Sequence, residues 1–189
     1  MFQVRIHGRG GQGVVTAAEL LAQSAFDEKR FAQAFPSFGS ERTGAPVVAF
    51  CRIADSEIRV REPIMFPDAI IIQDSTLLKQ IDVFAGLKSD GFALINSTRT
   101  FEQLGIADLS VNNPRFITVP ATAMAMEHLG RPVPNAVLLG AFAALTKVIS
   151  LNSVTDAINE KFKAKIAASN CAAATAAYEY VLAMVPADA

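Results

Sequence analysis

The N-terminal glycine-rich stretch is the feature that most constrains the fold. The apolar segment Phe2 to Ile6 runs directly into four glycines spread over residues 8–13. From there, apolar residues recur with the period of an α-helix, about 3.6 residues, on one side of the segment: Val14, Val15, Ala18, Leu21, Ala22, Ala25 and Phe26. The stretch therefore predicts a strand, a tight turn and a helix N-terminus. Free backbone N–H groups and the helix dipole make such a terminus an anion-binding position.

The glycine spacing allows three interpretations. Gly8, Gly10 and Gly13 match G-x-G-x-x-G, which alone is a weak sign of a dinucleotide site. Such a site also needs an acidic residue near the end of the second strand, about twenty residues further on. Gln33 occupies that region, and the acidic pair Asp27-Glu28 comes too early, where the first helix is expected to end. Contact with a ligand or subunit other than NAD is favoured, ahead of a purely structural turn and of bound NAD.

Composition limits the remaining possibilities. The chain has 189 residues, of which 51% are hydrophobic and 19% charged, which predicts a single domain over residues 1–189. A net charge of −1 argues against nucleic acid or an anionic membrane surface as a partner. Cys51 and Cys171 are isolated, so we expect two packing residues and no metal or iron–sulfur site in this chain. Neither a signal peptide nor a membrane span is visible, which predicts a cytoplasmic protein. The high apolar content predicts surfaces hidden against partner chains.

The pattern of elements predicts an α/β fold, a Rossmann-like and largely parallel sheet flanked by helices. A short strand is expected at Phe31 to Phe35, and an inserted antiparallel hairpin pairs Val47 to Ile53 with Glu57 to Arg61. Short apolar runs predict the later strands at Ala69–Ile72, Phe92–Asn96 and Phe116–Val119. Helical periodicity and capping residues predict helices at Ser75–Phe84, Ala121–Leu129, Asn135–Val148, Ser153–Ile166 and Asn170–Met184.

Polar residues gather where strands end. The loop from Pro36 to Pro46 carries the adjacent pair Glu41-Arg42 between glycines and aromatic residues. It is either a solvated turn with an exposed ion pair or a functional loop beside the glycine turn. Asp74 follows a buried strand, and we expect it to cap a helix rather than to contact a ligand. His7 and His128 stand alone, with no Ser/His/Asp set, so catalysis by this chain alone is not expected.

Residues 8–19 and 36–46 together resemble the gamma subunit of the 2-oxoacid:acceptor oxidoreductases, the family of pyruvate:ferredoxin oxidoreductase. The similarity extends over nearly the whole chain and includes the Asn135–Ala141 stretch. The resemblance implies a complex that decarboxylates a 2-oxoacid on thiamine diphosphate and releases an acyl-CoA. It places thiamine diphosphate, with Mg²⁺ as a candidate, and the [4Fe-4S] clusters in alpha-, beta- and delta-type partner chains. Electrons would go to ferredoxin or to an NAD-reducing subunit.

The gamma-type chain itself is implied to pack beside the active site and to hold no cofactor alone, with coenzyme A as a candidate contact. The residues expected to make that contact lie in the two motifs: Gly8, Gly10, Gly11, Gln12, Gly13, Ser37, Glu41, Arg42, Thr43 and Gly44. No catalytic residue and no metal ligand are expected. The alternative is a stand-alone nucleotide-binding or NAD-dependent oxidoreductase on a Rossmann-like domain.

Overall fold

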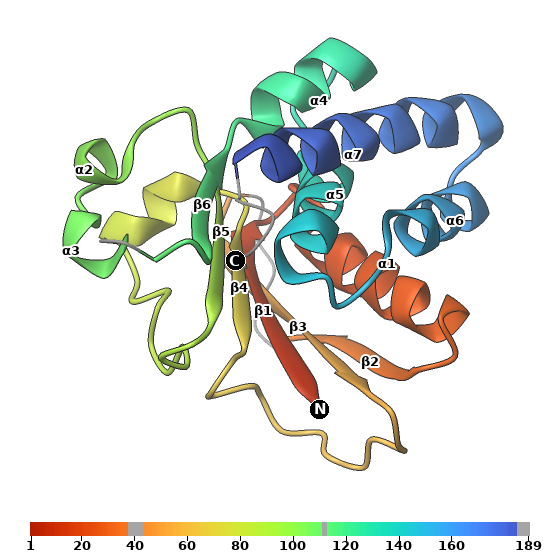
Figure 1. The fold of residues 1–189 in the computed structure, drawn as a ribbon, viewed down its shortest axis with the longest axis horizontal. Coiled ribbons are helices and arrows are strands. Elements are labelled where there is room, and N and C mark those ends of the chain that lie inside the picture. Colours follow the sequence, from red (N-terminus) through yellow and green to blue (C-terminus); the bar gives the residue numbers. More distant parts are fainter. Residues whose placement is uncertain (38–43, 111–112, 185–189) are drawn as a thin grey trace.

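The computed structural model describes residues 1–37, 44–110 and 113–184, and a six-stranded sheet forms its centre (Figure 1). The strands lie in the order β2-β3-β1-β4-β5-β6. Their bounds are β1 Phe2–Arg9, β2 Phe31–Pro36, β3 Pro46–Ala54, β4 Ala69–Ile72, β5 Phe92–Asn96 and β6 Phe116–Val119. β1, β4, β5 and β6 run parallel, whereas β3 pairs antiparallel with both β1 and β2. The expected α/β fold with a largely parallel sheet is confirmed.

The antiparallel part of the sheet differs from the expectation. β3 pairs with β2, and Glu57 to Arg61 forms no strand. Because β1 and β2 already occupy both edges of β3, no edge remains for a further strand. The buried guanidinium of Arg52 instead holds this segment, since it donates to the carbonyl oxygens of Val60, at 3.4 Å, and Glu62. The apolar residues that alternate in this segment, Ile58 and Val60, were expected to face inward, but Val60 is 44% exposed and Ile58 is only partly buried.

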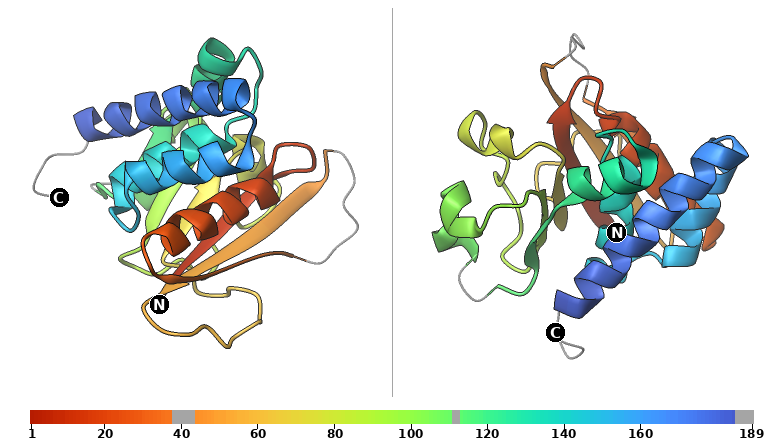
Figure 2. Two further views of the ribbon diagram at one scale, coloured as in Figure 1. Left: turned by 90° about the vertical axis from the view of Figure 1, so that its right-hand side faces the viewer. Right: turned by 90° about the horizontal axis from the view of Figure 1, so that it is seen from above.

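Helices cover the two faces of the sheet unequally (Figures 1 and 2). The larger group lies over one face: α1 Val14–Asp27, α4 Ala121–Leu129, α5 Asn135–Thr146, α6 Leu151–Lys161 and α7 Ala164–Met184. Short elements lie over the other: η1 Ser75–Lys79, α2 Phe101–Leu104 and α3 Ala107–Ser110. Each face has its own apolar cluster, the larger beneath the long helices. α5 is buried all round, which its nearly uninterrupted apolar sequence predicts.

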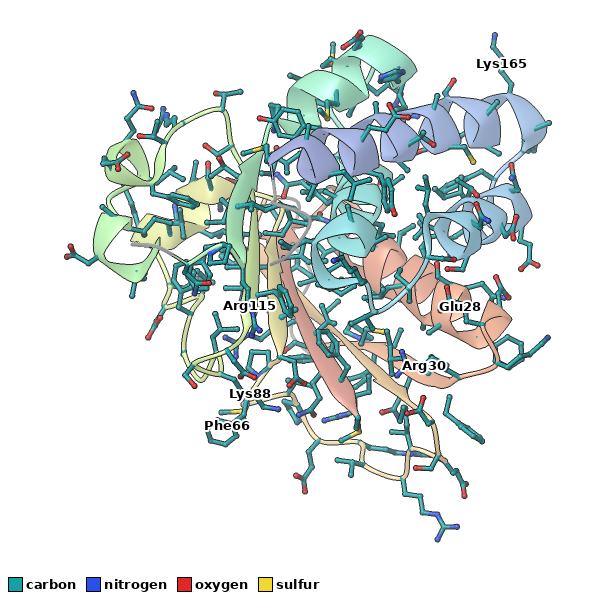
Figure 3. The ribbon with its side chains drawn as sticks, in the orientation of Figure 1. Glu28, Arg30, Phe66, Lys88, Arg115 and Lys165 are labelled. Atoms are coloured by element: carbon teal, nitrogen blue, oxygen red, sulfur yellow. The ribbon has the colours of Figure 1, made fainter. Side chains whose placement is uncertain are left out.

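Several helix boundaries depart from the expectation. α5 ends at Thr146 rather than Val148, and α6 ends at Lys161 rather than Ile166, because Lys147 is left-handed and Phe162 is extended. Ser150 rather than Ser153 caps α6, because the Ser153 hydroxyl binds Glu28 Oε1 at 2.7 Å instead. Glu28 follows the last residue of α1, and Figure 3 labels it there. The last helix begins at Ala164, well before Asn170. The helix expected from Ser75 to Phe84 is only the short η1, which Asp74 caps.

Candidate functional site at the glycine turn

The glycine turn, residues 8–13, leads from the end of β1 into α1. Gly11 and Gly13 have φ angles of +93° and +73°, a backbone conformation that side chains disfavour. Gly13 is the N-cap of α1 and offers no side-chain cap. Gly10 N donates to Ala45 O at 2.9 Å, and Gly44 N donates to Gly10 O at 3.2 Å. The turn therefore lies directly beside the end of the loop before β3.

Close packing explains two of the glycines. A Cβ on Gly8 would lie 2.6 Å from Val14 Cγ2, so the glycine lets α1 pack tightly on β1. A Cβ on Gly13 would lie 2.7 Å from Asn135 Nδ2, at the first residue of α5. Around Gly11, by contrast, no atom lies within 4 Å of such a Cβ among the residues that the structure describes. Gly11 therefore faces open space, where a ligand or another chain can approach the backbone.

Asp74 ties the glycine turn to the end of β4. Its Oδ2 accepts from Arg9 Nε and from Gln12 Nε2, each at 3.0 Å. Its Oδ1 caps η1 by accepting from Thr76 N at 3.0 Å. Arg9 also donates to Gly44 O at 3.0 Å, so one guanidinium joins β1, β4 and the loop before β3. These contacts hold the turn at the crevice between β1 and β4, where ligands bind in doubly wound sheets.

The ionisation of Asp74 reflects this network. Partial burial of the carboxylate raises its pKa, but hydrogen bonds from Thr76 and Gln12 and the charge of Arg9 outweigh that effect. The pKa of Asp74 therefore lies below its ordinary value, and the side chain is charged at neutral pH. Asp74 confirms the expectation of a helix cap and, in addition, is the anchor of the glycine turn.

A polar cleft of 340 Å³ adjoins this network at the carboxyl ends of β4, β5 and β6. Ser75, Ser97 and Thr98 line it with hydroxyl groups, and Arg99 adds a cation. Gln73, which is 2% exposed, also lines the cleft, and neither end of its amide has a partner among the described residues. The polar strand ends expected from the sequence therefore do meet at one edge of the sheet.

His7 lies in β1 next to the turn and is buried. Arg5 Nε donates to His7 Nε2 at 3.0 Å, so the neutral ring carries its proton on Nδ1, which has no partner in the described part of the chain. Burial, and secondarily the charge of Arg5, lowers the pKa of His7 to about 3. His7 therefore supports Arg5, which also donates to Val83 O and Ala85 O, and is not placed for acid–base chemistry.

The low pKa of His7 predicts a pH-dependent stability. Below pH 6.5 the unfolded chain binds a proton that the folded chain does not, so stability falls as the pH drops from 6.5 towards 3. At pH 5 this loss is about 2 kcal/mol. His7→Gln keeps an acceptor for Arg5 and should remove most of the difference between the thermal midpoints at pH 7 and pH 5. His128→Gln is the control, and a pH dependence lost equally in both variants would contradict the assignment.

The remaining reactive groups are the side chains that could bind a metal and the two cysteines. No group of three or more His, Cys, Asp or Glu side chains lies together in that part of the chain. Cys51 is buried in the main core, and burial raises the pKa of its thiol. Cys171 is half-buried on α7, and burial, followed by the charge of Asp156, raises its pKa. No helix in the described ranges combines the length and apolar character of a membrane span.

Comparison with known proteins assigns nearly the whole chain to one family. The family model described as pyruvate ferredoxin/flavodoxin oxidoreductase matches residues 3–180. The chain belongs to this family. It is 48% identical over 179 residues to the pyruvate synthase subunit PorC of Methanothermobacter marburgensis, covering 95% of this chain and 97% of the relative. It is 44% identical to the pyruvate/ketoisovalerate oxidoreductases common subunit gamma of Thermococcus litoralis, covering 95% and 96%.

Solved structures agree with this assignment. The PORC subunit of pyruvate oxidoreductase from Thermotoga maritima has a TM-score of 0.80 at 33% identity, with 94% of this chain and 95% of that chain covered. A 2-oxoglutarate:ferredoxin oxidoreductase from Magnetococcus marinus, at 18% identity and a TM-score of 0.75, shares the fold and spans 98% of this chain but only 31% of its own. The expected resemblance is confirmed, and this member of the family is a gamma subunit of a pyruvate/2-oxoacid ferredoxin oxidoreductase.

The structure brings together some of the residues expected at the site of this gamma subunit. Gly8 to Gly13 form the turn, and Gly44 is hydrogen-bonded to it. Ser37 lies just beyond β2, where its backbone N–H donates to Val48 O at 2.8 Å. Glu41, Arg42 and Thr43 lie outside the described residues. The side chain of Gln12 is already engaged, because its Oε1 accepts from Arg9 N at 2.8 Å and its Nε2 donates to Asp74.

Two further residues of this site, Arg9 and Asn135, were not expected from the sequence. Arg9, within the glycine motif, is the hub that reaches Asp74, Thr76, Gln80 and Gly44. Asn135 opens α5 against Gly13. The only signal for Arg9 was its position between glycines at the end of a strand, and for Asn135 its position at a helix start after two prolines.

Proposed function

We propose that this chain is the gamma subunit of a complex that oxidatively decarboxylates pyruvate to acetyl-CoA and passes the electrons to ferredoxin. Thiamine diphosphate and the [4Fe-4S] clusters are held by alpha-, beta- and delta-type partner chains in the cytoplasm, and an NAD-reducing subunit is the second candidate acceptor. The observation that carries the proposal is the match over nearly the full length of pyruvate synthase PorC subunits. Some relatives are named as the common gamma subunit of pyruvate and ketoisovalerate oxidoreductases. This name supports the proposal that the gamma subunit does not itself select the 2-oxoacid.

Within that complex, we propose that the glycine turn and the loop of residues 37–44 face coenzyme A beside the active site. The open space at Gly11, the uncapped N-terminus of α1 and the Gly10–Gly44 hydrogen bond support this. A Cβ-free backbone lets an anion approach the N–H groups closely. Arg42, outside the described residues, is the proposed cation for a carboxylate or phosphate, with Glu41 to hold it in place.

The test is an activity assay of the chain alone and in its complex. The chain is co-expressed with thiamine-binding and cluster-binding partner chains. The complex should oxidise pyruvate in the presence of coenzyme A and reduce ferredoxin or a viologen dye. The isolated chain should show no turnover with pyruvate, coenzyme A, thiamine diphosphate and either the dye or NAD. Turnover by the isolated chain, or a tight complex of it with NAD, would establish the stand-alone enzyme instead.

A further inference from the structure

A second cavity lies beside the glycine turn, on the side of the long helices. Its volume is 390 Å³, and it opens between the start of α1, the loop before α5 and the first two turns of α7. Leu129, Val133, Phe162 and Ile166 give it apolar walls. Small-molecule sites usually measure about 300–1,000 Å³ and combine apolar walls with a few placed polar groups. This cavity has the size and the apolar walls of a small-molecule site, so its polar groups determine which class of ligand it can bind.

Two buried asparagines line the cavity, and each has an amide atom without a hydrogen-bond partner among the described residues. Asn135 and Asn170 are each 4% exposed and both line it. Asn135 Oδ1 accepts from Ala136 N, and Asn170 Nδ2 donates to Ile166 O, each at 2.8 Å. The other atom of each amide, Asn135 Nδ2 or Asn170 Oδ1, has no hydrogen-bond partner among the described residues. Neither of these two atoms is fully buried. Since buried amides rarely stay unpaired, this donor and this acceptor are set for a ligand.

The mouth of the cavity is positively charged. Arg131 and Lys165 line it, and in the described ranges neither side chain forms a hydrogen bond or an ion pair. Figure 3 shows Lys165 extending from the first turn of α7 towards solvent, so this cation stands at the rim. None of the described residues that line the cavity is acidic. The start of α1, which has no side-chain cap, adds the positive end of a helix dipole on the opposite wall.

We infer that this cavity binds an organic anion. A phosphate or carboxylate group pairs with Arg131 and Lys165, and the apolar walls take the body of the molecule. The ligand also carries an amide-like edge, with an acceptor for Asn135 Nδ2 and a donor for Asn170 Oδ1. Inorganic pyrophosphate has neither an apolar body for the walls nor an amide-like edge for the two asparagines. Nucleotides have this combination of groups, and two sources supply it: the coenzyme A of the complex, or a separate nucleotide.

This site is distinguishable from the coenzyme A contact proposed above. The cavity shares Gly11 and Gly13 with the glycine turn, but its charged and amide groups come from α5, α7 and the loop before α5. Ligand binding in the cavity and the coenzyme A contact of the glycine turn can therefore be tested separately.

The test is calorimetric titration of the purified complex with adenosine diphosphate. The double variant Arg131→Gln/Lys165→Gln should weaken binding by roughly tenfold or more, because two charge-assisted contacts are lost. Both side chains are exposed, so the fold should persist. Arg61→Gln/Lys163→Gln is the matched control, since it removes the same charge from exposed positions outside the cavity and should leave the affinity unchanged.

Three outcomes would overturn the inference: no binding of adenosine diphosphate, an equal loss in the control variant, or equally tight binding of inorganic pyrophosphate. Competition by coenzyme A, with a raised KM for coenzyme A in the double variant, would identify the cavity as part of the co-substrate site. Binding without such competition and with an unchanged KM would identify a site for a separate nucleotide. Either result supports the inference, and neither depends on whether the glycine turn contacts coenzyme A.

Discussion

Replacement of Gly140 by alanine is expected to destabilise the chain by about 3 kcal/mol or more, although alanine favours helices over glycine by about 1 kcal/mol. Gly140 lies in the middle of α5, where a Cβ would come within 1.9 Å of the backbone oxygen of Ala174 in α7. A backbone oxygen cannot move aside as a side-chain end can. The two helices would have to separate, and the core between them, which includes Phe142 and Ala177, would lose its packing.

The measurement is the yield and thermal midpoint of the co-expressed complex that carries Gly140→Ala. A second variant, Gly140→Ala/Ala174→Gly, tests the cause, because removing the Cβ of Ala174 leaves its carbonyl oxygen in place and should not restore stability. Gly130→Ala is a useful comparison, since it has a φ of +66° but no atom within 4 Å of its added Cβ among the described residues. It should cost only about 1 kcal/mol. A Gly140→Ala complex as stable as the wild type would contradict the close helix contact.

The sequence predicted the parallel half of this fold well because the signals there are local. The strand Ala69–Ile72 is a short run of apolar residues, and it is buried at every position, as a central parallel strand requires. The helix Ala121–Leu129 ends at Gly130, which adopts the left-handed conformation expected of a C-terminal glycine. Each of these features depends on residues close together in the chain.

The antiparallel half could not be predicted in the same way. Whether β3 pairs with the segment before or after it depends on which neighbour reaches its free edge, and alternation alone does not decide this. The buried guanidinium of Arg52 holds residues 57–61 away from the sheet edge, through carbonyl oxygens 8 and 10 positions further along the chain. Nothing in the sequence around Arg52 indicates that its side chain is buried. Prediction of the site was limited in the same way. The glycines could be recognised in the sequence, but the Arg9–Asp74 ion pair could not, because its residues lie 65 positions apart.

That ion pair supplies the second large effect, expected from Asp74→Asn. The amide has one oxygen in place of two, so either Arg9 and Gln12 or Thr76 must face an NH₂ group instead of an acceptor. Hydrogen bonds to charged groups contribute about 1.5–3 kcal/mol each, so we expect a stability loss in that range. The variant should also release the glycine turn from β4. If the turn contacts coenzyme A, as proposed, the KM for coenzyme A should rise roughly tenfold.

The opposite end of the same strand provides a matched control. Asp68 precedes β4 and its side chain is 18% exposed, against 16% for Asp74. It pairs with Lys88 at 2.5 Å and accepts from Gln3 N at 2.7 Å, so Asp68→Asn disrupts a comparable ion pair far from the glycine turn. Both variants should lower the thermal midpoint of the complex, but only Asp74→Asn should raise the KM for coenzyme A while leaving that for pyruvate unchanged. Equal KM values in the two variants would mean that the Arg9–Asp74 pair only stabilises the fold, because a general loss of stability would affect both alike.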